Sequence, residues 1–246
     1  MCYSLAVLSP KEIIRARFNV EILPQENYPQ YYYVSAFDYP RLPVVTGSSP
    51  QALSYFHWGL IPSWVKTEDE AETVRKKTMN ARAESIYDKP AFRRAAASQH
   101  CLVLVDGFFE WQDVSGRKYP YFIRLKTREP FALAGLWDVW TDPSTAQPQY
   151  TVSIVTCPAS PLLSMIHNTA KRMPVLLPRS LERRWIDPRV SAPEARALLV
   201  PCPDEILEAF TVAKIATSRG TANTPEAIAP YRYPELSPSK GQTSLL

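Results

Sequence analysis

The sequence has few of the features that define membrane proteins, metal sites and disulfide frameworks. No apolar run approaches the roughly 18–20 residues needed to cross a bilayer, and no secretory signal opens the chain. The four cysteines, Cys2, Cys101, Cys157 and Cys202, lie far apart, with no Cys-x-x-Cys pair and no histidines at metal-ligand spacing. We therefore expect a soluble, cytoplasmic protein from a reducing compartment, with no metal and no cofactor.

The charge is modest in total but clustered along the chain. The net charge of +4 does not by itself argue for a nucleic-acid partner. Basic residues occur in groups, often near aromatic residues, at positions 75–77, 93–94, 117–118, 171–172 and 183–184. This pattern predicts a basic groove. Each group taken alone also fits a solvated face of the protein.

Local patterns predict a mixed fold. Ser9-Pro10-Lys11-Glu12 is typical of a helix start with a serine N-cap and a capping box, and this helix is expected to end near Asn19. Further helices are predicted in TEDEAETVRKK, DKPAFRRAAASQ, SPLLSMIH, SLERRWI and APEARALL. Strands are predicted in YYYVSAF, CLVLVDGFFEWQ, YPYFIRLK, FALAGLWDVW, YTVSIVT, RMPVLLP and LEAFTVAKI. Since helices and strands do not alternate as βαβ units, we expect one antiparallel-rich α+β domain over residues 2–220. Residues 221–246, rich in proline and serine, are predicted to form a flexible tail.

Cys2 follows the initiator Met1, whose removal is expected before a small second residue. Removal leaves an α-amine and a thiol on one residue, and these groups titrate near ~7.7–8 and ~8.5 when unperturbed. Both nucleophiles are therefore partly available at neutral pH. With an aldehyde, the amine forms an imine and the thiolate then closes a five-membered thiazolidine ring. The alternative is that Cys2 simply begins a strand.

Two further segments carry candidate polar residues. In MNARAES, Asn80, Arg82 and Glu84 alternate, so an extended segment presents them on one side. A turn with a surface charge is the alternative. Glu110 lies among aromatic residues in DGFFEWQ. Such surroundings disfavour the ionised carboxylate, and the raised pKa suits a proton shuttle. Pairing with an arginine is the alternative for Glu110.

One histidine and two tryptophans complete the candidates. His167 ends the predicted helix SPLLSMIH and has either a catalytic or a structural role. Trp58 and Trp64 flank a glycine and a proline in HWGLIPSW. Exposed tryptophans stack on unpaired bases at ~1–3 kcal/mol per base. Core packing is the alternative for Trp58.

Six separated blocks resemble, in the same order, the SRAP family of SOS response-associated peptidase or abasic-site processing proteins. The blocks are Cys2, HWGLIPSW, MNARAES, CLVLVDGFFEW, FALAGLWD and IHNTAKRMPVLLP. The resemblance implies a single domain with a barrel-like mixed, mostly antiparallel sheet flanked by short helices, and a basic channel for single-stranded DNA. At an abasic site the opened sugar exposes an aldehyde at C1′, which is the electrophile that the Cys2 aminothiol requires.

The same resemblance implies a role for individual residues. The catalytic cysteine of the family matches Cys2. Asn80 is implied to position the cysteine and the opened sugar, and Arg82 to bind phosphate. Glu110 is implied to shuttle protons during imine formation and ring closure. His167 is implied to lie near the hydroxyl of the opened sugar.

The DNA-binding candidates come from two blocks. Trp58, Pro62 and Trp64 match the block that lines the DNA channel of the family, where stacking holds the strand. Lys171 and Arg172 form one of the basic groups and are further candidate DNA contacts.

Two departures from the family pattern affect the predicted site. Family members commonly begin Cys-Gly-Arg, whereas Tyr3 and Ser4 follow Cys2 here, so the phosphate contact of that arginine has no counterpart. The common His-x-Arg-Met-Pro spacing is lengthened, since four residues separate His167 from Arg172. An outward bulge of this loop keeps His167 at the site. Otherwise Lys171 is the nearest substitute.

The sequence thus predicts a monomeric DNA-damage protein that binds single-stranded DNA and covalently captures abasic sites through a Cys2 thiazolidine. It is also expected to process its own N-terminus. Two alternatives remain open. One is a cysteine amidohydrolase or peptidase with an N-terminal nucleophile, which acts on acyl substrates. The other is a non-catalytic binder of single-stranded DNA.

Overall fold

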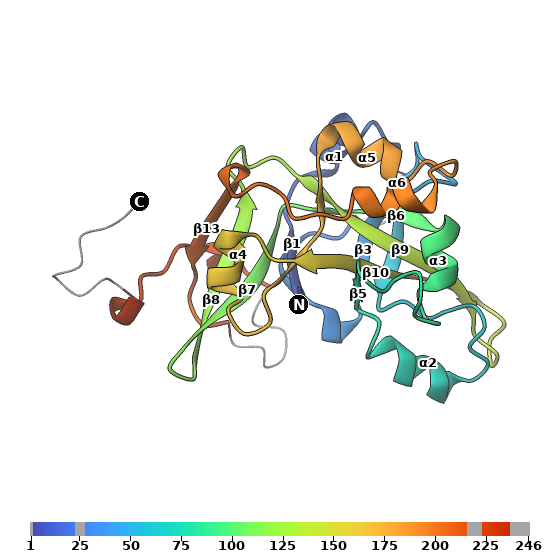
Figure 1. Ribbon diagram of the computed structural model, residues 1–246, viewed down its shortest axis with the longest axis horizontal. Helices are drawn as coiled ribbons and strands as arrows, with labels where there is room; N and C mark the ends of the chain where they lie inside the picture. Colours follow the sequence, from blue (N-terminus) through green and yellow to red (C-terminus); the bar gives the residue numbers. More distant parts are fainter. Residues whose placement is uncertain (1, 23–27, 216–222, 237–246) are drawn as a thin grey trace.

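The computed structural model describes residues 2–22, 28–215 and 223–236, and its strands form two sheets (Figure 1). The first sheet is antiparallel, with the strand order β13-β8-β7-β1-β2. Its strands are β1 (Ser4–Val7), β2 (Tyr31–Ser35), β7 (Gly107–Val114), β8 (Arg117–Leu125) and β13 (Leu207–Thr211). The strands predicted in YYYVSAF and LEAFTVAKI therefore form the two edges of this sheet.

The second sheet contains a closed ring of five strands. The ring consists of β3 (Arg41–Thr46), β4 (Ser54–Trp58), β6 (His100–Val105), β9 (Phe131–Thr141) and β10 (Pro148–Pro158). The pairing of β9 with β10 closes it. Three short strands extend the ring, namely β5 (Asn80–Arg82), β11 (Arg172–Pro174) and β12 (Leu176–Leu177). Only β4 and β5 pair in parallel with β10 among the described strands. The predicted α+β fold with a barrel-like, mostly antiparallel sheet is confirmed.

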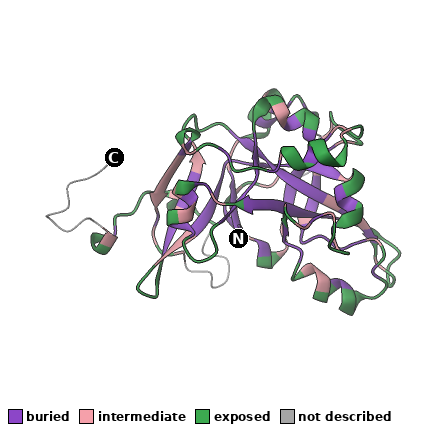
Figure 2. Cartoon of the chain, viewed as in Figure 1, coloured by how far each residue is buried: buried purple, intermediate pink, exposed green. Residues whose placement is uncertain are grey.

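Short helices surround the two sheets, and their outer faces are exposed while most strand residues are buried (Figure 2). The helices are α1 (Lys11–Phe18), α2 (Glu68–Arg75), α3 (Arg93–Ser98), α4 (Pro161–Ile166), α5 (Arg179–Trp185) and α6 (Ala192–Ala197). Short 3-10 turns are η1 (Ala36–Asp38), η2 (Asp204–Ile206), η3 (Pro225–Ile228) and η4 (Pro234–Leu236). In Figure 1, α4 lies over the first sheet and the other helices lie around the ring. Each fully buried Leu, Val, Ile or Phe side chain in the strands contributes ~1.5–3 kcal/mol to folding.

Asp106 marks the point where the chain passes from the ring to the first sheet. The segment CLVLVDGFFEWQ, predicted as one strand, is divided here into β6 and β7. The Asp106 carboxylate accepts hydrogen bonds from the backbone N–H of Leu8 at 2.5 Å and of Ser9 at 2.9 Å, and from the Ser9 hydroxyl. The prediction that Ser9 caps α1 is therefore wrong, because its side chain binds Asp106 and Pro10 occupies the N-cap. The predicted helix end is confirmed, with Asn19 in the left-handed region at φ 50°.

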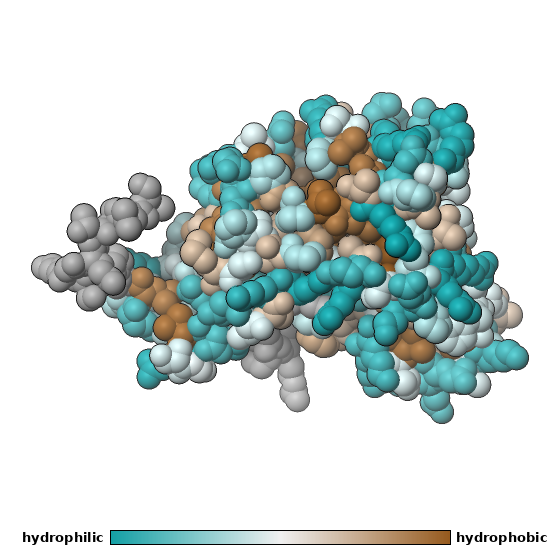
Figure 3. Space-filling model, in the orientation of Figure 1, coloured by the Kyte–Doolittle hydropathy of each residue, from teal (hydrophilic) through white to brown (hydrophobic). Residues whose placement is uncertain are grey.

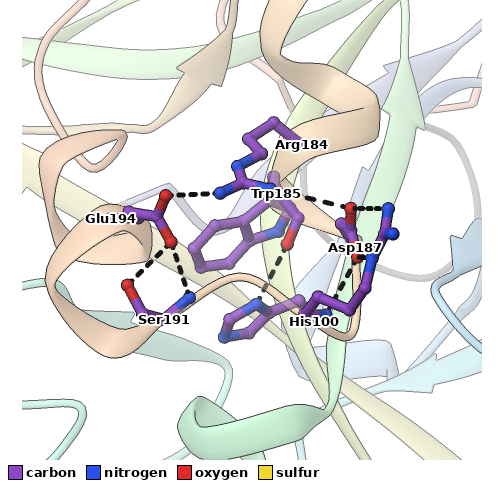
Figure 4. Close-up of polar contacts among 7 residues, drawn as sticks. His100, Arg184, Trp185, Asp187, Ser191 and Glu194 are labelled. Carbon is purple, nitrogen blue, oxygen red and sulfur yellow. Dashed lines mark hydrogen bonds and ion pairs between the residues drawn. The ribbon is translucent and has the colours of Figure 1, made fainter.

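A polar network joins α5 and α6 to the ring (Figure 4). The His100 ring stacks on Trp185 with centroids 4.0 Å apart, and its Nδ1 lies 3.0 Å from the Trp185 carbonyl oxygen. Arg184 pairs with Glu194 and lies 3.7 Å from Asp187. His100 is therefore a structural residue.

The two arginines of the basic group at positions 183–184 also form contacts within the fold. The Arg183 guanidinium donates to the backbone carbonyls of Phe18 and Pro50. Arg184 pairs with the Glu194 carboxylate, so both arginines form contacts with neighbouring elements of the fold.

Part of the predicted flexible tail packs against the first sheet. The Tyr233 hydroxyl donates to the Val212 carbonyl at 2.9 Å, and its ring lies 5.0 Å from that of Tyr119. Tyr233 thus contacts Tyr119 on β8 and Val212, the residue that follows β13. Residues 221–222 and 237–246 of the predicted tail lie outside the described residues.

Candidate active site between the two sheets

Four predicted residues meet where the two sheets approach the N-terminus of the chain (Figure 1). Cys2 precedes β1, Asn80 begins β5, Glu110 lies in β7 and His167 follows α4. The Asn80 Nδ2 donates to the Cys2 carbonyl at 2.8 Å, and the His167 Nδ1 lies 3.4 Å from the Glu110 Oε2. All four residues are buried. We call them the Cys2 cluster.

Glu110 reaches this cluster because of the strand register. Phe109 pairs with Ser4, so the next residue of β7 lies level with the first residues of the chain. Burial raises the pKa of Glu110 to about 8, although the positive charge of the N-terminus lowers it. At neutral pH most Glu110 side chains therefore carry a proton and can donate it.

His167 and Glu110 form a neutral pair. Burial lowers the pKa of His167, and the hydrogen bond to the Arg172 carbonyl offsets this only in part. Because a carbonyl only accepts, the 2.9 Å contact with Arg172 places the proton of the neutral ring on Nδ1. The distance of 3.4 Å between the His167 Nδ1 and the Glu110 Oε2 is also within the range of an ion pair. Since the pKa of His167 is lowered and that of Glu110 is raised, we interpret it as a contact between uncharged groups.

The Cys2 thiol needs a base before it can react. Burial raises the pKa of this thiol, and the charge of Glu110 raises it further. The thiol is therefore protonated at neutral pH, although the thiolate is the reactive form. The Cys2 thiol donates a weak hydrogen bond to the Ser4 carbonyl, with the sulfur 3.9 Å from the oxygen. Proton transfer to a neighbouring group is thus part of any chemistry at Cys2.

Asn80 holds the backbone of Cys2 and leaves one polar atom available. Its Nδ2 binds Cys2, while its buried Oδ1 has no hydrogen-bond partner. A buried acceptor without a partner costs free energy unless a ligand or water satisfies it. Asn80 is placed by Met79, whose carbonyl accepts from the Trp58 Nε1 at 2.8 Å and from the Ile154 N–H at 3.1 Å.

This contact corrects the prediction for Trp58. The Trp58 side chain is fully buried, so it supports the strand that carries Asn80 and offers no face to a base. Pro62 is buried as well. Of the three residues predicted from HWGLIPSW, Trp64 alone is exposed, at 51% of its surface.

The lengthened loop after α4 bulges away from the site and leaves His167 in place. The Lys171 N–H donates to the His167 carbonyl at 2.8 Å, and Lys171 adopts a left-handed φ of 49°. The Asn168 side chain exchanges two hydrogen bonds with the Asp113 backbone on β7, at 3.0 and 2.8 Å. His167 is thus held at the start of the loop, while the Lys171 side chain is exposed.

We expect the substitution Asn168→Ala to raise the pKa of His167 towards its ordinary value of about 6.5. Without the two Asp113 bonds the loop admits water, and the burial that lowers this pKa is reduced. An NMR titration of the three histidines measures the change. Thr169→Ala, an exposed residue of the same loop, is the control. An unchanged His167 pKa in Asn168→Ala would show that the loop does not position the ring.

Arg172 is a structural residue, which corrects its prediction as a DNA contact. It is buried and forms a two-pronged ion pair with Glu84, one arm at 2.9 Å. Its Nη2 also donates to the Thr156 carbonyl at 2.6 Å. Glu84 therefore pairs with Arg172, and the hydrogen bond from Arg172 together with the charges of Arg172 and Arg82 lowers the pKa of its carboxyl.

A pocket of about 500 Å³ opens beside Asn80. Apolar, polar and basic residues line it together. The basic members are Lys77, Arg82 and Lys89, and the exposed Trp64 also lines the pocket. Sequence reasoning missed Lys89, which is an isolated lysine between helices. Lys77 belongs to the basic group 75–77, and the clustering of charge in that group is the feature from which it could be predicted.

The described part of the chain contains no group of His, Cys, Asp and Glu side chains that could hold a metal ion. Over the same residues, no helix has the length and apolar character of a membrane span. Cys2, Cys101, Cys157 and Cys202 are all buried and unpaired with one another.

Comparisons with known proteins agree on one family. A family model described as SOS response associated peptidase (SRAP) matches residues 1–218. The chain is 34% identical over 231 residues to the abasic site processing protein YoqW of Bacillus subtilis, covering 93% of this chain and 99% of that protein. It is 32% identical over 204 residues to the abasic site processing protein HMCES of Gallus gallus, covering 74% of this chain and 59% of that protein.

Solved structures show the same likeness. A crystal structure of a Bacteroides thetaiotaomicron protein matches with a TM-score of 0.86 and 33% identity, over 94% of this chain and 100% of that one. A second, from Bordetella bronchiseptica, matches with a TM-score of 0.76 and 26% identity, over 87% of this chain and 100% of that one.

Proposed function

Because the chain belongs to the SOS response associated peptidase (SRAP) family, we propose that it captures abasic sites in single-stranded DNA through a thiazolidine formed by Cys2. The observation that supports this proposal is the Cys2 cluster, in which a proton donor, Glu110, and a hydrogen-bond acceptor, Asn80, lie beside Cys2. The names of the Bacillus and Gallus relatives as abasic site processing proteins support the choice of substrate.

Glu110 acts first as an acid. The Cys2 amine adds to the C1′ aldehyde of the opened sugar and gives a carbinolamine. The protonated Glu110 donates its proton to the carbinolamine hydroxyl, which leaves as water, and the iminium forms. The pKa of about 8 keeps this proton available at neutral pH.

Glu110 then acts as a base. Its carboxylate takes the proton of the Cys2 thiol as the sulfur bonds to C1′, and the electron pair of the C=N bond moves to nitrogen. The product is a five-membered ring, and the net change is the loss of one water. This order fits the raised pKa of the thiol, which stays protonated until Glu110 has given up its own proton.

The other members of the Cys2 cluster position the reactants. The unpartnered Asn80 Oδ1 accepts a hydrogen bond from the Cys2 amine or from a sugar hydroxyl. His167, uncharged with its proton on Nδ1, presents Nε2 as an acceptor for the hydroxyl released when the sugar opens. The pocket with Lys77, Arg82 and Lys89 holds the phosphates of the strand, and Trp64 stacks on a base.

Removal of Met1 is the step that exposes the amine, and we propose that the protein performs it. The family description as a peptidase supports self-processing. Glu110 and His167 lie beside the residue whose N-terminal bond must be cleaved.

The proposal is tested by mixing the untagged protein with an oligonucleotide that contains one abasic site. We expect a band that survives denaturing electrophoresis, with the intact mass of the chain lacking Met1 plus the oligonucleotide minus one water. An undamaged oligonucleotide is the control. An acyl group on Cys2 in place of DNA would favour the amidohydrolase. Equal, salt-sensitive and purely non-covalent binding of both oligonucleotides would favour the simple DNA binder.

A further inference from the structure

We propose that Tyr3 and Phe37 form a stacking platform that binds a nucleobase next to the abasic nucleotide. This inference rests on the proposed function. Tyr3 directly follows Cys2, and its ring lies 5.1 Å from the ring of Phe37, with 33° between their planes. Phe37 is 63% exposed, the most exposed large apolar side chain among the described residues. Most of the face shown in Figure 3 is hydrophilic, with hydrophobic residues in small patches.

The backbone fixes Phe37 in this exposed position. The turn η1 (Ala36–Asp38) carries it, and the Ser35 hydroxyl accepts the Phe37 N–H at 3.3 Å. The Ala36 N–H donates to the Tyr3 carbonyl at 2.8 Å, which ties the turn to the start of β1. Phe37 is therefore held beside Tyr3 by hydrogen bonds and not by burial of its own ring. A rigid exposed ring is available to a ligand at little entropic cost.

Tyr3 adjoins Cys2 in the chain and lies within electrostatic range of one residue of the Cys2 cluster and one residue of the basic pocket. Burial and the charge of Glu110 raise the pKa of the Tyr3 hydroxyl, while the charge of Arg82 lowers it. Tyr3 is thus close to both residues. Arg82 lines the pocket with Lys77 and Lys89. A nucleotide whose phosphate meets Arg82 can reach the platform with its base.

Of the two residues that follow Cys2, Tyr3 is the one whose side chain is available to a ligand. Tyr3 and Ser4 follow Cys2 at the start of the first sheet. Ser4 is buried, and its hydroxyl donates to the Tyr33 hydroxyl at 2.9 Å, so Ser4 does not reach a phosphate. Tyr3 supplies an aromatic face at the same end of the strand. The occupant that fits an aromatic face beside a phosphate-binding pocket is a nucleobase.

The test combines a protein variant with changes to the DNA. Three oligonucleotides carry the abasic site with both neighbouring bases present, with the 5′ base removed, or with the 3′ base removed, using tetrahydrofuran at the removed position. For the wild type, removal of one of the two bases is expected to raise the half-saturating DNA concentration for crosslinking roughly 5- to 150-fold, from stacking of ~1–3 kcal/mol per base. Phe37→Ala is expected to lose this dependence on that base.

Two further variants serve as controls. Phe37→Leu keeps apolar area without an aromatic face, and it is expected to behave as Phe37→Ala with a melting temperature closer to the wild type. Tyr150→Ala removes another exposed stacked ring, 45% exposed and 5.2 Å from the Phe56 ring, and is expected to keep the dependence on the base. The platform is refuted if neither neighbouring base matters to the wild type, or if Phe37→Ala retains the wild-type dependence. If the wild type forms no adduct with any oligonucleotide, the proposed function itself fails.

Discussion

Cys2→Ser is expected to abolish the DNA adduct that survives denaturing electrophoresis. The intact mass of Cys2→Ser first establishes that Met1 is gone and that the α-amine is free. That amine forms an imine with the abasic aldehyde, but the hydroxyl is too weak a nucleophile to close the ring. The imine is hydrolysed on denaturation. Borohydride, which reduces an imine to a stable amine, is therefore expected to restore a band for Cys2→Ser.

The controls separate the chemistry of Cys2 from loss of folding. Cys202→Ser changes another buried thiol, which lies away from the Cys2 cluster, and is expected to leave the adduct unchanged. An adduct of undiminished amount in Cys2→Ser without borohydride would contradict the thiazolidine. A Cys2→Ser protein with no borohydride-dependent band would show that the amine does not reach the aldehyde.

Glu110→Gln is expected to slow adduct formation about 10²- to 10⁴-fold, the usual contribution of a positioned acid or base. The wild-type rate should be bell-shaped in pH. It rises as the α-amine loses its proton near ~7.7–8. It falls as Glu110 loses its proton near pH 8, so that the acid form is no longer present. Glutamine cannot ionise, so the alkaline fall is expected to disappear.

Single-turnover crosslinking rates between about pH 6 and pH 10 measure both effects. Glu129→Gln, the same change at an exposed carboxylate, is the control and is expected to keep the wild-type profile. A full bell-shaped profile in Glu110→Gln would assign the alkaline limb to another group and remove Glu110 from the proton transfer.

The same variant is expected to be more stable than the wild type at pH 8. The Glu110 carboxyl has a pKa of 4.5 when unfolded and about 8 when folded. Between these values the folded state binds more protons, so the free energy of unfolding of the wild type falls as pH rises from about 4.5 to about 8. Glutamine does not ionise, so the variant does not undergo this decrease in the free energy of unfolding, which is on the order of a few kcal/mol. Urea unfolding near pH 4 should show no gain, and unfolding at pH 8 should show the full gain.

Local sequence determined much of the fold because strand and helix patterns depend on neighbouring residues. The hairpin of β7 and β8 and the start of α4 at Ser160 follow from turn and capping residues that the sequence displays. The start of α1 does not, because Asp106 competes for Ser9 from 97 residues away. Such a competitor is invisible to any local pattern.

The candidate site divides in the same way. The residue types of Cys2 and Glu110 set the possible chemistry, since an aminothiol calls for an aldehyde and a carboxyl among aromatic residues keeps its proton. Tertiary structure alone decided which neighbours serve that chemistry. Trp58 became a core residue through a bond to Met79, 21 residues away, and Arg172 was engaged by Glu84, 88 residues away. Burial and pairing are set by the residues that folding brings together, and those partners are not adjacent in the chain.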